Sequence, residues 1–154
     1  MASATDHLAD FRAKHPSMTL QSTAPLLAGS SLGSTDTSFV IAEWRDAGGV
    51  SETPRLIAPW HVHHNDDELW YVLEGKLRVA RGVEEVEAGA GAAVLVPRET
   101  AHTYWNPGPD PARYLLIMTP NIFGLIQEIH AMKDRSRPAL EEVFRKHDSE
   151  LVDP

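Results

Sequence analysis

Three histidines and one glutamate are the residues of this sequence whose types and spacing most clearly suggest chemistry. His61 and His63 lie in a segment that alternates like a β-strand, and Glu68 follows the polar turn at residues 65–67. Residues two apart on a strand face the same side, so His61 and His63 should project together. A hairpin-like return of the chain would bring Glu68 beside them. His102, at the start of a later predicted strand, could add a third imidazole.

Such a set of side chains is chemically suited to a metal ion. Three neutral imidazoles and a carboxylate favour a divalent first-row metal such as Fe, Mn, Ni, Co or Zn. The chain has no cysteine, which excludes thiolate ligands, disulfides and a nucleophilic thiol. A metal with five or six ligands would keep positions open for water, dioxygen or a chelating substrate. A His-x-His pair alone is weak evidence, because exposed strands carry such pairs by chance.

The bulk composition limits the class of protein. A length of 154 residues and a hydrophobic content of 42% predict one globular domain. The net charge is −8 and no basic cluster stands out, so neither nucleic acid nor an anionic membrane is expected as a partner. The N-terminal region has no apolar signal segment, and no long apolar run follows it. We therefore expect a soluble, cytoplasmic protein.

The pattern of the chain predicts a small all-β barrel or sandwich that ends in helices. Eight short strands are expected at residues 38–45, 55–64, 68–75, 76–81, 84–88, 92–97, 102–106 and 114–119. Apolar residues at helical spacing predict a helix at 122–134, and Pro138 could begin a second. We divide the chain into an N-terminal arm (1–37, with a short helix at Thr5–Lys14 and a loop or short strand after it), a barrel (38–119) and a helical tail (120–154).

Two motifs in the predicted barrel resemble those of the cupin superfamily. The first is His, one residue, His, four residues, Glu, six residues, Gly, filled here by His61, His63, Glu68 and Gly75. The second is Gly, five residues, Pro, a turn, His, three residues, Asn, filled here by Gly91, Pro97, His102 and Asn106. The resemblance covers about residues 38–119. One departure is Glu99, where the turn after the proline usually carries glycine; Glu does not readily adopt positive φ.

The resemblance implies a small cupin (double-stranded β-helix, or jelly-roll) barrel with short C-terminal helices. It also implies one divalent transition metal per chain, held by His61, His63, Glu68 and His102. In dioxygenase members of the superfamily the matching glutamate also acts as a base, so the resemblance suggests a catalytic role for Glu68. Such a carboxylate could take a proton from an enol or phenol.

Other polar and aromatic residues near the site allow two interpretations each. Tyr104 shares a face with His102 and could contact substrate or donate a proton, or it could be a barrel aromatic. Trp70 could wall the cavity or simply pack in the core. Arg55 would face the same side as His61 if the strand were regular, but it is more simply interpreted as a solvated arginine. His64 would become a ligand only if the register slipped by one residue. The remaining histidines are interpreted as surface residues: His7, His15, His130 and His147.

Three functions remain open from the sequence. The first is a metal-dependent, dioxygenase-like enzyme acting on a small chelating substrate such as an enol, flavonol or diketone, as in the quercetinase-type cupins that the chain resembles. The second is non-redox cyclase or isomerase chemistry on a polyketide-like substrate, for which zinc would suffice. The third is a cupin that binds a small molecule without changing it. Cupins commonly pair through outer strands or an N-terminal arm, which implies a homodimer.

Overall fold

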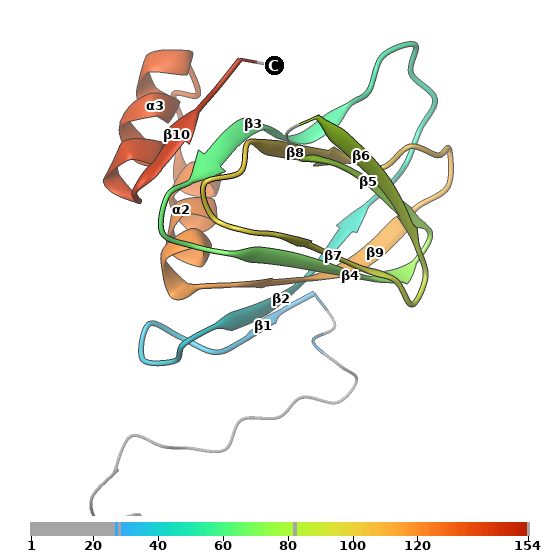
Figure 1. Ribbon diagram of the computed structural model, residues 1–154, viewed down its shortest axis with the longest axis horizontal. Helices are drawn as coiled ribbons and strands as arrows, with labels where there is room; N and C mark the ends of the chain where they lie inside the picture. The colour runs from blue at the N-terminus through green and yellow to red at the C-terminus, as the bar shows by residue number, and fades with distance from the viewer. Residues whose placement is uncertain (1–26, 28, 82, 154) are drawn as a thin grey trace, which may run out of the picture.

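Two five-stranded antiparallel sheets face each other and form the barrel (Figure 1). The computed structural model describes residues 27, 29–81 and 83–153; the helix predicted at Thr5–Lys14 lies outside them. The first sheet contains, in spatial order, β1 (Ser31–Leu32), β2 (Val40–Asp46), β9 (Ala112–Met118), β4 (Glu68–Glu74) and β7 (Ala93–Val96). The second contains β10 (Ser149–Leu151), β3 (Leu56–His63), β8 (His102–Trp105), β5 (Lys76–Arg81) and β6 (Glu84–Gly89). The all-β jelly-roll prediction is confirmed.

All eight predicted strands are present, with ends shifted by only a few residues. Two further strands are present. The two-residue β1 lies in the N-terminal arm, where a loop or short strand was expected; β10 was not predicted, because three residues are too short to show an alternating pattern. Both pair at the margins of the sheets: β1 with β2, and β10 with β3. The tail at residues 120–154 therefore contributes a strand to the barrel as well as helices.

Alternation along the strands fills the interior of the barrel. Residues at every second position of β4 and β9 are fully buried, among them Trp70, Val72, Tyr114 and Leu116. Trp70 is 0% exposed and belongs to the main core. Its ring lies 5.8 Å from that of His102, but Trp70 is not among the residues that line the cavity beside the site, so the core-packing interpretation describes its place. The period of two predicts which side chains face inward.

Two helices follow the last long strand and cover one end of the barrel (Figure 1). The first, α2 (Pro120–Ala131), begins at Thr119, whose hydroxyl accepts a hydrogen bond from the backbone N–H of Ile122. The second, α3 (Arg137–Lys146), packs against α2 with Phe144 buried between the helices and the barrel. No helix of the described residues is long and apolar enough to span a membrane.

The outer face of the first sheet leaves apolar side chains exposed. Tyr71 on β4 is 39% exposed and Leu95 on β7 is 48% exposed. Single exposed apolar residues are normal for a protein surface. The homodimer therefore stays a prediction.

Replacing Gly75 with alanine should destabilise the barrel. Gly75 joins β4 to β5 with φ of 74°, and a Cβ there would collide with the carbonyl oxygen of Pro111. Left-handed backbone costs a residue with a Cβ about 1–2 kcal/mol, and the collision adds to this. We expect urea denaturation to show a loss of at least about 2 kcal/mol. Gly89→Ala is the control, because its Cβ would meet nothing within 4 Å; equal losses in the two variants would contradict this explanation.

Candidate metal centre

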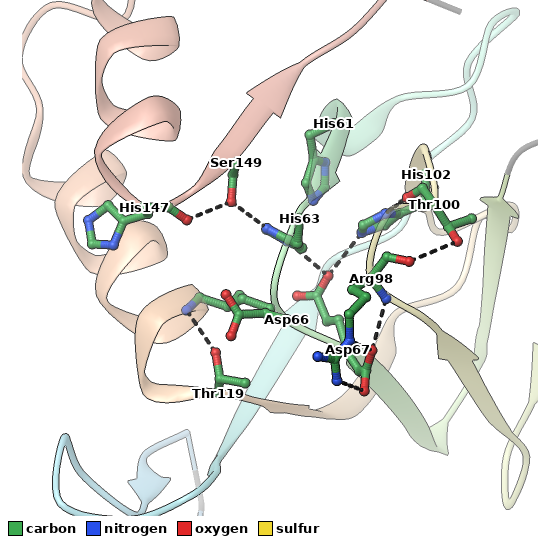
Figure 2. Close-up of polar contacts among 12 residues, drawn as sticks. His61, His63, Asp66, Asp67, Arg98, Thr100, His102, Thr119, His147 and Ser149 are labelled. Carbon is green, nitrogen blue, oxygen red and sulfur yellow. Dashed lines mark hydrogen bonds and ion pairs between the residues drawn. The ribbon is translucent and has the colours of Figure 1, made fainter.

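The four predicted ligands meet at one end of the barrel. His61 and His63 lie at the end of β3, Glu68 begins β4, and His102 begins β8. One ligand atom from each residue lies within 4.8 Å of the other three, and all four side chains are buried. Pairing of β3 with β8 places His61 directly opposite His102. Figure 2 shows the three imidazoles converging from these two strands.

Two of the histidines have their protonation pattern fixed by the backbone. His61 Nδ1 lies 2.7 Å from the carbonyl oxygen of Pro59, and His102 Nδ1 lies 2.9 Å from that of Thr100. A carbonyl oxygen can only accept a hydrogen bond, so each Nδ1 must carry the proton. We therefore assign the Nδ1–H tautomer to both neutral rings. The lone pair on each Nε2 is then free to bind a metal. Metal-binding histidines usually donate their other ring N–H to a carbonyl or carboxylate in this way, which fixes the tautomer.

The third histidine is oriented by a residue from the C-terminal tail. His63 Nδ1 lies 2.8 Å from the hydroxyl oxygen of Ser149 on β10 (Figure 2). Strand pairing sets this contact, because Ser149 lies opposite His63 in the β3–β10 register. Sequence analysis missed Ser149: it is 86 residues away in the chain and belongs to no motif.

The inner ends of these side chains fit a cation. His102 Nε2 lies 3.0 Å from Glu68 Oε2, and His63 Nε2 lies 3.6 Å from the same oxygen. His63 Nε2 is buried and has no hydrogen-bond partner among the described residues. A nitrogen lone pair and a carboxylate oxygen this close repel each other, so a positive charge must lie between them: either a proton on Nε2, which then donates a hydrogen bond to Glu68, or a metal ion. Imidazole and carboxylate donors suit a divalent transition metal, so this buried group could hold one.

The pKa values of two ligands favour their metal-binding forms. Burial, with a smaller contribution from the nearby His102 and His63, lowers the pKa of His61 to about 3. Burial alone would raise the pKa of Glu68, but hydrogen bonds and charge interactions with His102 and His63 more than offset this and leave it below its ordinary value. At neutral pH His61 is therefore neutral and Glu68 is ionised.

A cavity of about 240 Å³ opens above this group and is lined by His61, His63 and Glu68. Its walls are largely apolar and come partly from the helices of the tail. They include Leu116, Ile122, Leu125, Ile126, Ile129 and Phe144. The cation at its rim, Arg45, has a side chain that is 68% exposed. The cavity therefore offers a largely apolar chamber in which three of the four ligand residues are among the few polar side chains of the lining.

Tyr104, the second predicted catalytic residue, lies in the wall of this cavity. Its hydroxyl is 3.3 Å from that of Tyr114, which also lines the cavity and was not singled out by sequence analysis. Burial raises the pKa of Tyr104 well above its usual value and that of Tyr114 to about 12. Both phenols therefore stay protonated at neutral pH.

The other residues weighed from the sequence lie away from the ligand group. Arg55 is exposed and paired with Asp46 at 2.9 Å, as expected of a solvated arginine. His64 points outward, 3.2 Å from Glu99, so the register does not slip. Glu99 adopts φ of 61° in the turn after Pro97. The turn thus keeps a glycine-like backbone, and Glu99 bears the strain while it pairs with His64.

Two histidines interpreted as surface residues have partners that the sequence did not indicate. His147 is largely buried, and its ring contacts Asn121 at 3.1 Å and Glu128 at 3.0 Å. His130 lines the cavity and packs edge-on against Trp44, with ring centroids 5.3 Å apart. No spacing rule links these pairs, because they join separate elements. The interpretation of His147 as a surface residue was therefore wrong.

Comparison with known proteins agrees with the motifs. Residues 52–118 match the family model described as "Cupin domain". The chain therefore contains a cupin domain. The similar solved structures include a cupin protein from Bacteroides fragilis, with a TM-score of 0.51 and 19% identity over 67% of this chain and 84% of that one. That likeness shows the fold of this cupin and nothing finer.

Two further similarities involve proteins named for sugar chemistry. A sugar phosphate isomerase of the cupin superfamily from Silicibacter pomeroyi has a TM-score of 0.46 and 24% identity, over 54% of this chain and 51% of that one. Mannose-1-phosphate guanylyltransferase RfbM from Salmonella typhimurium is 30% identical over 63 residues, which are 41% of this cupin and 13% of RfbM. This cupin thus matches only a small part of RfbM.

The metal-free protein should lose stability as the pH falls. The pKa of His61 is about 3 when folded and 6.5 in the unfolded reference, so between these values the unfolded state binds more protons. Stability then rises with pH, by at most about 1.4 kcal/mol per pH unit from this group. The lowered pKa of Glu68 acts in the same direction below its reference value of 4.5. Urea denaturation across this range should show the slope, and His61→Gln should flatten it; an unchanged slope in that variant would contradict the assignment.

Proposed function

We propose that this cupin is a metal-dependent enzyme acting on a small organic substrate whose oxygens chelate the metal, in a dioxygenase-like reaction. The observation that carries the proposal is the buried three-histidine, one-glutamate group, three members of which line a largely apolar cavity. His61, His63, Glu68 and His102 would hold the ion. A bound Fe, Mn, Ni or Co ion would supply Lewis acidity, open coordination positions and reactivity toward dioxygen.

The lining of the cavity supports an uncharged, largely apolar substrate. A phosphate group would lose its hydration there, beside Asp46 and Glu68, and the cation at the rim, Arg45, is mostly exposed. A buried charge without a partner is strongly unfavourable. An enol, flavonol or diketone meets apolar walls along its body and places its oxygens at the ligand group. We therefore favour this class over the sugar phosphates suggested by the names of the two relatives above.

Glu68 is the residue we propose as the base. Its lowered pKa keeps it ionised at neutral pH, and its Oε2 already lies within 3.0 Å of His102 Nε2. An acidic enol or phenol bound at the cavity end would bring its proton to this carboxylate. Transfer to a positioned carboxylate typically contributes a factor of about 10²–10⁴ to the rate.

The tyrosine pair supports the alternative of non-redox cyclase or isomerase chemistry. A hydrogen bond between two hydroxyls uses one of their two protons and leaves the other for an acceptor in the cavity. Tyr104 and Tyr114 stay protonated, so they could donate to an oxyanion while Glu68 accepts a proton. A base and an acid in one apolar chamber suit proton transfer at carbon, which needs no oxygen.

Metal analysis and oxygen consumption test the proposal together. We expect about one divalent metal per chain by ICP-MS in untagged protein purified without chelator. Loaded with Fe, Mn, Ni or Co, the protein should consume oxygen with at least one member of an enol, diketone and flavonol panel. Turnover that is unchanged under anaerobiosis, or native zinc, would favour the cyclase or isomerase. A ligand that stabilises the protein but is recovered unchanged would indicate a binding protein, and failure to take up any metal would refute the proposal.

Removing the Tyr104 hydroxyl should slow turnover without affecting metal content. In Tyr104→Phe the cavity keeps its shape but loses a protonated donor, so we expect kcat to fall about 100-fold, with little change in KM. Tyr71→Phe is the matched control, because Tyr71 lies on the outer face of the sheet, outside the cavity lining. Equal turnover by the two variants would assign Tyr104 to packing alone.

A further inference from the structure

A line of polar contacts connects the C-terminal tail to one metal ligand. Ser149 on β10 contacts His63 Nδ1 at 2.8 Å and donates its hydroxyl proton to the carbonyl oxygen of His147 at 2.9 Å (Figure 2). We infer that Ser149 is a positioning residue that holds His63 in the tautomer able to bind the metal. The inference rests on the metal centre of the proposed function and adds to it a residue from outside both cupin motifs.

The direction of the hydrogen bonds follows from counting protons. A serine hydroxyl has one proton, and a backbone carbonyl can only accept. Because the hydroxyl of Ser149 donates to the carbonyl of His147, it can only accept from His63. The proton of a neutral His63 ring must then lie on Nδ1, which leaves the Nε2 lone pair facing the centre. The carbonyl of His147 therefore fixes the state of His63 through Ser149.

His63 needs this control more than the other two histidines do. The Nδ1 atoms of His61 and His102 face backbone carbonyls, which permit only one tautomer. His63 faces a hydroxyl, which could donate or accept if it were free to rotate. In the other tautomer, Nε2–H of His63 would point toward Glu68 Oε2, now 3.6 Å away. A hydrogen bond formed there would block the nitrogen that has to bind the metal.

The carbonyl of His147, which accepts the Ser149 proton, is itself held by α2, and α2 also contacts the turn between His63 and Glu68. Asn121 Nδ2, at the start of α2, donates to the carbonyl of His147 at 2.9 Å and to Asp66 Oδ2 at 2.8 Å. Asp66 is buried and lies in the turn between His63 and Glu68. The contacts therefore form a closed loop that begins and ends beside the same ligand. The other face of α2 lines the cavity, so one helix supports both the centre and the chamber.

Substitution of Ser149 tests the inference through zinc affinity and tautomer state, without any turnover measurement. Loss of a second-sphere partner typically weakens metal binding about 10–100-fold. We expect that increase in the Zn²⁺ dissociation constant of Ser149→Ala, measured in competition with a chromophoric chelator. In metal-free protein, long-range ¹H–¹⁵N spectra should show the proton of His63 on Nδ1 in the wild type and partly on Nε2 in the variant.

A second pair of variants separates the hydroxyl from the packing. Ser149→Thr keeps the hydroxyl and Ser149→Val replaces it with a methyl of similar shape, so only the valine variant should lose affinity. Thr103→Val is the control for a lost buried hydroxyl near the site, since the Thr103 hydroxyl donates to the carbonyl of Ala58 and touches no ligand. We expect it to keep the wild-type zinc affinity.

The outcomes distinguish the inference from the proposed function. If the wild type binds Zn²⁺ and both Ser149→Ala and Ser149→Val bind it equally well, with His63 still protonated on Nδ1, the positioning role of Ser149 is refuted and the metal centre stands. If the wild type takes up no zinc, the metal centre is refuted, and the inference with it. Circular dichroism melting of each variant shows that a weaker affinity does not come from unfolding.

Discussion

The close approach of imidazole nitrogens to one carboxylate oxygen is the constraint on which the rest of this structure depends. His102 Nε2 lies 3.0 Å from Glu68 Oε2, with both side chains almost fully buried. Unpaired polar groups in such surroundings are costly, and each must have a partner or a cation. The outward nitrogens are held by backbone carbonyls and a serine, so that in the neutral rings the inward nitrogens are free and could bind a metal. Barrel, turns and tail all serve to hold this arrangement.

The ligands come from both sheets, which makes the centre sensitive to how the sheets are joined. His61, His63 and His102 belong to the second sheet, whereas Glu68 begins a strand of the first. The segment between His63 and Glu68 crosses from one sheet to the other, and the buried Asp66 within it is tied to α2. A short polar segment that looked like an ordinary turn is thus the connection on which the distance between ligands depends.

Much of this arrangement could be predicted from the sequence. The residues that the prediction missed share one physical cause. Alternation located the eight main strands and placed His61 and His63 on one face, because the period of a strand is fixed. The hairpin expected to bring Glu68 beside them is instead a crossing between the two sheets, since β3 and β4 do not pair. Pairings between distant elements leave no such period. Ser149, Asn121 and His147 act through contacts that exist only after the tail has folded onto the barrel. Glu99 shows the converse: the motif marked its position, but not that glutamate would take up a left-handed backbone there.

The position of Ser149 late in the chain determines when, during synthesis, the metal centre can be completed. His63 and Ser149 are separated by 86 residues, and the cavity wall on α2 also follows the last long strand. During synthesis the barrel motifs leave the ribosome well before the tail that orients His63. An ion captured early would meet a His63 whose tautomer is not yet selected, whereas one captured later meets the finished centre. Because metal binding contributes to folding free energy, docking of β10 and retention of the ion should reinforce each other.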